Sequence, residues 1–122
     1  MLIRCPAGVA ITRHDQFKFI EAAKRELMAM AKEASVPLHQ VEFIVPFVPT
    51  DFDMDALLFL ETDAQLRGPD AELWKAWLTR ELLRLLQTQG YPQRWLDEVT
   101  FEFDSHENVV KNFKGSYFYR TR

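Results

Sequence analysis

A short apolar segment near the middle of the chain, 57–60, restricts the possible folds more than any other part of the sequence. Side chains of a β-strand alternate between the faces of a sheet, so Leu57 and Phe59 point one way while Leu58 and Leu60 point the other. Because both sets are apolar, we expect a strand over 57–62 that is buried on both faces. Any fold for this chain therefore has to cover its sheet on two sides.

Helical and strand patterns flank this segment. Apolar residues that recur every three to four positions predict helices over 15–34 and 71–89, and Gly90 suits the left-handed turn that closes a helix. β-Branched residues, or alternation of apolar with polar residues, predict further strands over 8–12, 41–48 and 98–104. Pro46 cannot donate a ladder hydrogen bond, which places its strand at a sheet edge or at a bulge.

The order of these elements, β-α-β-β-α-β, matches the ferredoxin-like arrangement, an antiparallel sheet with helices on one face. A short helix near 106–113 and an extra strand at 116–121 are expected to follow. We therefore predict a single α+β domain over 1–122, with its core at about 8–104 and an aromatic, basic C-terminal extension over 105–122. A chain of 122 residues that is 48% hydrophobic can fold without disulfides or a structural metal.

Composition argues against several classes of protein. The net charge of −3 argues against a dedicated nucleic-acid binder, because contact with phosphates needs a cationic surface. No run approaches the ~20 apolar residues of a transmembrane helix, and no signal-peptide pattern is present. The single cysteine, Cys5, excludes an internal disulfide and fits a reducing compartment. We expect a cytoplasmic protein with no nucleic-acid or membrane partner.

Motifs for catalysis and for metal binding are missing. His14, His39 and His106 lie far apart in the sequence, and none has a second ligand at helical spacing. The sequence also lacks a Gly-x-Ser-x-Gly turn and a glycine-rich phosphate loop. We therefore expect no metal, no cofactor and no catalytic set. Acid–base chemistry by one histidine with a carboxylate partner stays open, and His39 is the first candidate.

Three alternating aspartates, Asp51, Asp53 and Asp55, have the spacing of the first three ligands in a calcium-binding loop. Such a loop needs a glycine at its sixth position and a bidentate acid at its twelfth, where this chain has Ala56 and Thr62. We interpret the three aspartates as a solvated acidic loop, with weak cation binding or contact with a basic partner as the alternatives.

Two side chains of the second predicted helix, Leu73 and Trp77, fall outside its apolar stripe and lie near arginines. Tryptophan beside arginine is typical of protein contact surfaces, so both residues are candidates for partner binding. The alternative is that Trp77 packs at the edge of the core under a loop.

The C-terminal region is rich in aromatic residues: half of the 16 in the chain lie in 91–122. In the expected last strand Tyr117 and Tyr119 share one face and Phe118 takes the other. Such a strand needs a cover on both faces. It could join its own sheet, pack across a dimer, or form a surface for a nucleic acid or ligand.

Taken together, these patterns favour a non-enzymatic protein-interaction module. Residues 42–72 hold eight acids against one arginine, a net charge of −7, while 106–122 hold four cations against one acid, a net charge of +3. We expect a homodimer whose acidic segment meets a basic protein, as in an inhibitor or immunity protein. The alternative is a small enzyme or ligand-binding protein of the dimeric α+β barrel type. Its pocket would lie between sheet and C-terminal tail and would use His39, Tyr117 or Tyr119. A component of a larger assembly is a third possibility.

Overall fold

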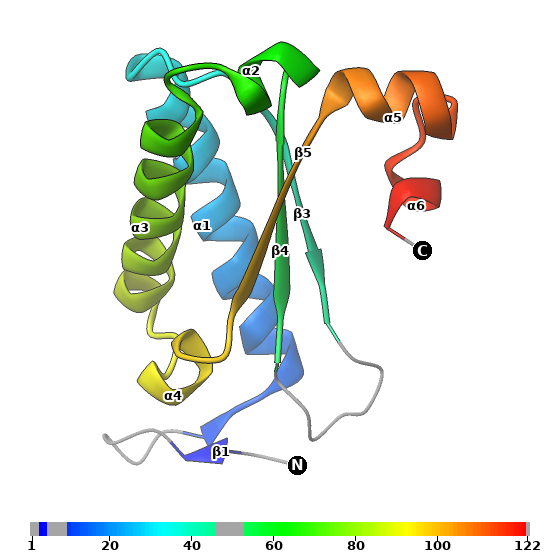
Figure 1. Ribbon diagram of the computed structural model, residues 1–122. Helices are drawn as coiled ribbons and strands as arrows, with labels where there is room; N and C mark the ends of the chain where they lie inside the picture. Colours follow the sequence, from blue (N-terminus) through cyan, green and yellow to red (C-terminus); the bar gives the residue numbers. More distant parts are fainter. Residues whose placement is uncertain (1–2, 5–9, 46–52, 122) are drawn as a thin grey trace.

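A computed structural model describes residues 3–4, 10–45 and 53–121 of the chain (Figure 1). Within these ranges the protein is α+β, with six helices, a three-stranded mixed sheet and a separate two-stranded ladder. In chain order, the elements are β1 (Ile3–Arg4), β2 (Ala10–Ile11), α1 (Arg13–Glu33), β3 (Leu38–Ile44), β4 (Asp55–Leu60), α2 (Asp63–Arg67), α3 (Ala71–Gln89), α4 (Gln93–Leu96), β5 (Thr100–Ser105), α5 (His106–Phe113) and α6 (Tyr117–Arg120).

Strand β4 is the centre of the three-stranded sheet, in the order β3-β4-β5. It pairs antiparallel with β3, where Leu58 lies opposite Val41, and parallel with β5, where Leu58 lies opposite Phe103. Every residue of β4 after Asp55 is buried. The expectation of a strand with two apolar, buried faces is therefore confirmed.

The antiparallel ferredoxin-like sheet is not what the described residues form. Helix α3 carries the chain back across the sheet before β5 begins, so β5 runs parallel to β4. The strand predicted over 8–12 is represented by β2, which pairs with β1 (Ile3 opposite Ile11) and not with the sheet. β-Branched residues and alternation predict these strands but carry no information on their partners. The end of the predicted strand 41–48, with Pro46, lies outside the described residues.

Helices cover both faces of the sheet, and not one face as predicted (Figure 1). Helices α1 and α3 pack on the face that carries Leu58 and Leu60, and together they form the larger core. Helices α5 and α6 lie on the opposite face, where Val109 packs against Leu57 and Phe59. The second face of β4 is thus covered by the same chain.

Helix ends follow the local sequence. Thr12 opens α1 with a reciprocal cap: its Oγ1 accepts from the Asp15 amide at 3.1 Å, and its own amide donates to the Asp15 carboxylate at 3.0 Å. Gly90 ends α3 with a φ of 105°, the left-handed conformation that the sequence predicts there. None of the helices in the described ranges is both long and apolar enough to cross a membrane.

The strand predicted at 116–121 is wrong, because the structure has the short helix α6 there. Ser116 caps this helix: its Oγ accepts from the Tyr119 amide at 3.2 Å. Arg120 then binds carboxylates on β5. A helix cap and ion pairs to a distant strand stabilise this segment.

Candidate functional site

The outer side of α3 carries the two partner-contact candidates of this helix. Its buried stripe consists of Ala71, Leu78, Leu82, Leu85 and Leu86. Leu73 lies off that stripe with 69% of its surface exposed, the largest exposed fraction among the large apolar side chains of the described residues. Trp77 is half-buried and packs against the edge of the core. Both placements proposed for Trp77, core edge and contact surface, are therefore compatible with its position.

Two hollows flank α3. A hollow of about 270 Å³ lies between the end of α1 and the start of α3, and Val36, Leu73 and Trp77 are among its lining residues. A larger groove of about 830 Å³ runs along the other side of α3, toward α4 and β5, where Leu96 and Phe103 line it. The outer side of α3 is consequently a ridge between two concave, partly apolar surfaces.

The three aspartates predicted as an acidic contact loop do not share one environment. Asp51 lies outside the described residues, and Asp53 is exposed. The Asp55 carboxylate accepts a hydrogen bond from the Thr100 hydroxyl, which joins the start of β4 to the start of β5. Across the residues that the structure describes, no three His, Cys, Asp or Glu side chains lie close enough to hold a metal ion.

The fold brings together two histidines that are 67 positions apart in the sequence (106 minus 39). The rings of His39 and His106 stack with their centroids 3.8 Å apart. His39 Nδ1 lies 3.0 Å from a Glu61 carboxylate oxygen, and His106 Nδ1 lies 2.7 Å from the Tyr117 hydroxyl. We call His39, Glu61, His106 and Tyr117 the histidine–tyrosine cluster. Sequence spacing could not reveal it, because its members come from four different elements or connections.

The phenol of Tyr117 has a raised pKa. Burial raises the pKa of its phenol to about 12, and the carboxylates of Glu42, Glu61 and Asp104 add to the effect. The phenol is therefore neutral at physiological pH and shares a hydrogen bond with His106 Nδ1, in which the donor depends on the imidazole tautomer. Its ring packs edge-on against the ring of Phe59, with the two centroids 4.8 Å apart. The cluster thus attaches α5 and α6 to the sheet.

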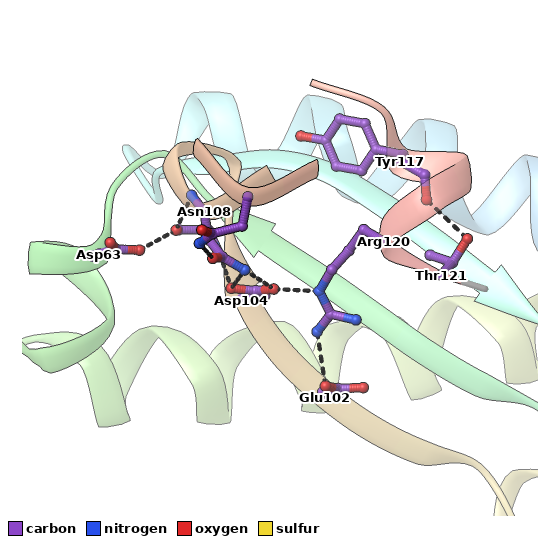
Figure 2. A network of polar contacts seen from close by, with 9 residues as sticks. Asp63, Glu102, Asp104, Asn108, Tyr117, Arg120 and Thr121 are labelled. Atoms are coloured by element: carbon purple, nitrogen blue, oxygen red, sulfur yellow. Dashed lines mark hydrogen bonds and ion pairs between the residues drawn. The ribbon is translucent and has the colours of Figure 1, made fainter. Parts of the chain in front are cut away.

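A second set of polar contacts strengthens this attachment (Figure 2). Asp104, near the end of β5, accepts from the Ser105 amide at 2.8 Å and from the Asn108 side chain at 2.9 Å. Arg120 of α6 reaches back to the same carboxylate, with Nε at 2.5 Å, and to Glu102 at 2.9 Å. These contacts place α6 against β5.

Asp63, at the start of α2, belongs to the same region. It accepts a hydrogen bond from the Ser105 hydroxyl, and this bond, helped by Lys111 at 3.7 Å, lowers the pKa of its carboxyl group. Ser105 in turn caps α5, since its Oγ accepts from the Asn108 amide at 3.0 Å. The beginning of α2 is therefore linked to the beginning of α5.

Tyr117 and Tyr119, the aromatic candidates of the C-terminal segment, point in different directions. Because 117–120 is helical, Tyr117 faces the sheet while Tyr119 is 54% exposed. The prediction that both tyrosines share one face is wrong, for the same reason that the strand is wrong. Phe118 is 67% exposed.

No protein-family model, curated protein or solved structure matches this chain.

Proposed function

We propose that this chain is a non-enzymatic protein-interaction module and that the outer side of α3 is its contact surface. One observation carries the proposal: Leu73 is 69% exposed beside a hollow lined by Trp74 and Trp77. A large apolar side chain next to tryptophans and Arg80 has the composition of an interface centre, where aromatic residues and arginine are enriched.

The packing under the C-terminal helices supports this proposal over a small enzyme of the dimeric barrel type. Such an enzyme needs an open sheet face that forms its pocket. Leu57 and Phe59, which face that side, are 2% and 0% exposed and contact side chains of α5 and α6. Tyr117 and His106 hold this cover in place by a mutual hydrogen bond.

The acidic segment supports a contact surface less strongly than α3 does. The carboxylates of Asp55, Glu61 and Asp63 already interact with Thr100, His39 and Ser105 within the chain. Binding of a basic protein through Asp51 and Asp53, and a cytoplasmic setting, stay predictions.

The test uses Leu73→Glu with Val110→Glu as the matched control. Leu73 is the third residue of α3, where glutamate suits the helix N-terminus, so the variant is expected to fold. Val110 is 53% exposed on α5, and this helix lies on the other side of the sheet from α3 (Figure 1). In affinity capture from the native cell, wild type and Val110→Glu should retain the same identified proteins, and Leu73→Glu should lose them. Retention by Leu73→Glu, or equal loss by both variants, contradicts the proposal.

A further inference from the structure

We infer that the partner of this surface is a second copy of the chain, bound with the two α3 helices antiparallel around a two-fold axis beside Trp77. The inference rests on the proposed function, because it takes the outer side of α3 as the contact surface. It adds the identity of the partner and the relative orientation of the two copies.

Five residues form a continuous stripe along this side of α3 and its N-cap. Their spacing of three, four, three and four positions keeps them on one face, as in the seam between two paired helices. The stripe consists of Asp70, Leu73, Trp77, Arg80 and Arg84. All are exposed except the half-buried Trp77. An exposed stripe with this spacing fits a second helix.

Charge along the stripe is complementary to itself. Asp70 precedes Trp77 by seven residues and Arg84 follows it by seven, so each lies ~10.5 Å from Trp77 along the helix axis. In an antiparallel pair centred on Trp77, Asp70 of each copy meets Arg84 of the other, and the contact occurs twice. A two-fold interface requires this kind of self-complementarity. A parallel pair would instead place arginine against arginine.

The other members of the stripe follow the same symmetry. Arg80 lies three residues after Trp77, and Leu73 lies four residues before it on the same flank of the stripe. The antiparallel pair therefore brings each Arg80 beside Leu73 of the other copy, where its aliphatic stem can cover the leucine. The hollow beside Trp77 gives room for side chains of the second copy.

The charged residues at both ends of the stripe are available for this contact. Asp70 is the N-cap residue of α3, yet its side chain makes no capping hydrogen bond. Arg84 is held by surface contacts, to Glu81 at 3.1 Å and to the sulfur of Met30 at 3.7 Å. The contact with Met30 places the guanidinium on the side of α3 that faces α1. Exposed ion pairs of this kind exchange partners at small energetic cost.

Sedimentation velocity of two charge reversals, Asp70→Lys and Arg84→Glu, tests the inference. Wild type should form a dimer at micromolar concentration. Each variant alone should dimerise about tenfold more weakly, because two like-charged contacts replace two attractive ones. An equimolar mixture of the two variants should recover a dimer close to wild type in affinity. In the mixed dimer each reversed charge meets the other, and the native Asp70 meets the native Arg84.

Recovery in the mixture requires both chains to be folded, so misfolding of one variant cannot produce it. Arg84→Lys keeps the charge and should retain the dimer, which separates loss of charge from loss of the arginine itself. A wild-type monomer at all concentrations, a dimer unaffected by either reversal, or a mixture without recovery would each overturn the inference. The proposed function is tested separately. If Leu73→Glu loses a partner other than a second copy of the chain, the outer side of α3 is still a contact surface even when this inference fails.

Discussion

Replacing Tyr117 by phenylalanine isolates what its hydroxyl contributes to the attachment of the C-terminal helices. The substitution keeps the ring against Phe59 and removes the 2.7 Å hydrogen bond to His106. A bond of this kind contributes about 0.5–1.5 kcal/mol. At pH 8 we therefore expect Tyr117→Phe to lower the free energy of unfolding by about 1 kcal/mol.

The same hydroxyl makes stability depend on alkaline pH. Burial, with Glu42, Glu61 and Asp104 nearby, raises the pKa of Tyr117 from 10.0 to about 12 in the folded chain. Its stabilising effect is complete below pH 10 and is lost as the pH rises toward 12, because the unfolded chain ionises first. Two pKa units correspond to about 2.7 kcal/mol for a fully shielded group. Tyr117 is partly exposed, so we expect about 1 kcal/mol after solvent screening.

Urea unfolding of wild type and Tyr117→Phe between about pH 8 and pH 11.5 measures both effects. The stability difference between them should shrink steadily above pH 10. Tyr119→Phe is the control: Tyr119 is 54% exposed, so removal of its hydroxyl should leave the unfolding free energy unchanged at both ends of the range. A difference between wild type and Tyr117→Phe that stays constant to pH 11.5 would refute the shielding of this phenol.

Two other substitutions test how the elements are joined. Tyr91→Phe removes the hydroxyl that accepts a 2.9 Å hydrogen bond from the side-chain amide of Gln16, a residue with 0% exposure. We expect the free energy of unfolding to fall by about 1–2 kcal/mol and the melting temperature, measured by calorimetry, to fall by roughly 4–8 °C. An unchanged melting temperature argues against this bond. Arg120→Gln weakens the contacts of α6 with Asp104 and Glu102. Trypsin should therefore cleave after Lys114 faster in this variant than in wild type, as followed by mass spectrometry. Equal cleavage rates would show that the ion pairs do not hold α6 in place.

The elements that the sequence predicts well are those that local physics determines. The helix predicted over 71–89 coincides with α3, because an apolar stripe, Gly90 and the following proline act within one stretch of chain. The burial of β4 on both faces followed from four consecutive apolar residues, whose cover is required wherever the strand lies. Leu73 was identified as a contact candidate by the same helical geometry.

The parts that sequence reasoning missed depend on contacts between distant residues. The direction of β5 is determined by how α3 crosses the sheet, which no strand pattern records. His39 and His106 meet because the start of β3 and the end of β5 lie at the same end of the sheet. The sequence predicts a strand over 116–121, although Ser116 and Arg120 stabilise a helical turn there.

The two faces of the central strand are completed by parts of the chain that leave the ribosome at different times. Helices α1 and α3 alternate with the strands along the sequence, so the face with Leu58 and Leu60 has all its helices before β5 is finished. Helices α5 and α6 follow the last strand of the sheet. The apolar face of Leu57 and Phe59 is therefore the last to lose contact with water during synthesis. A nascent chain paused before residue 106 presents this face to chaperones, and to other chains, as an adhesive surface.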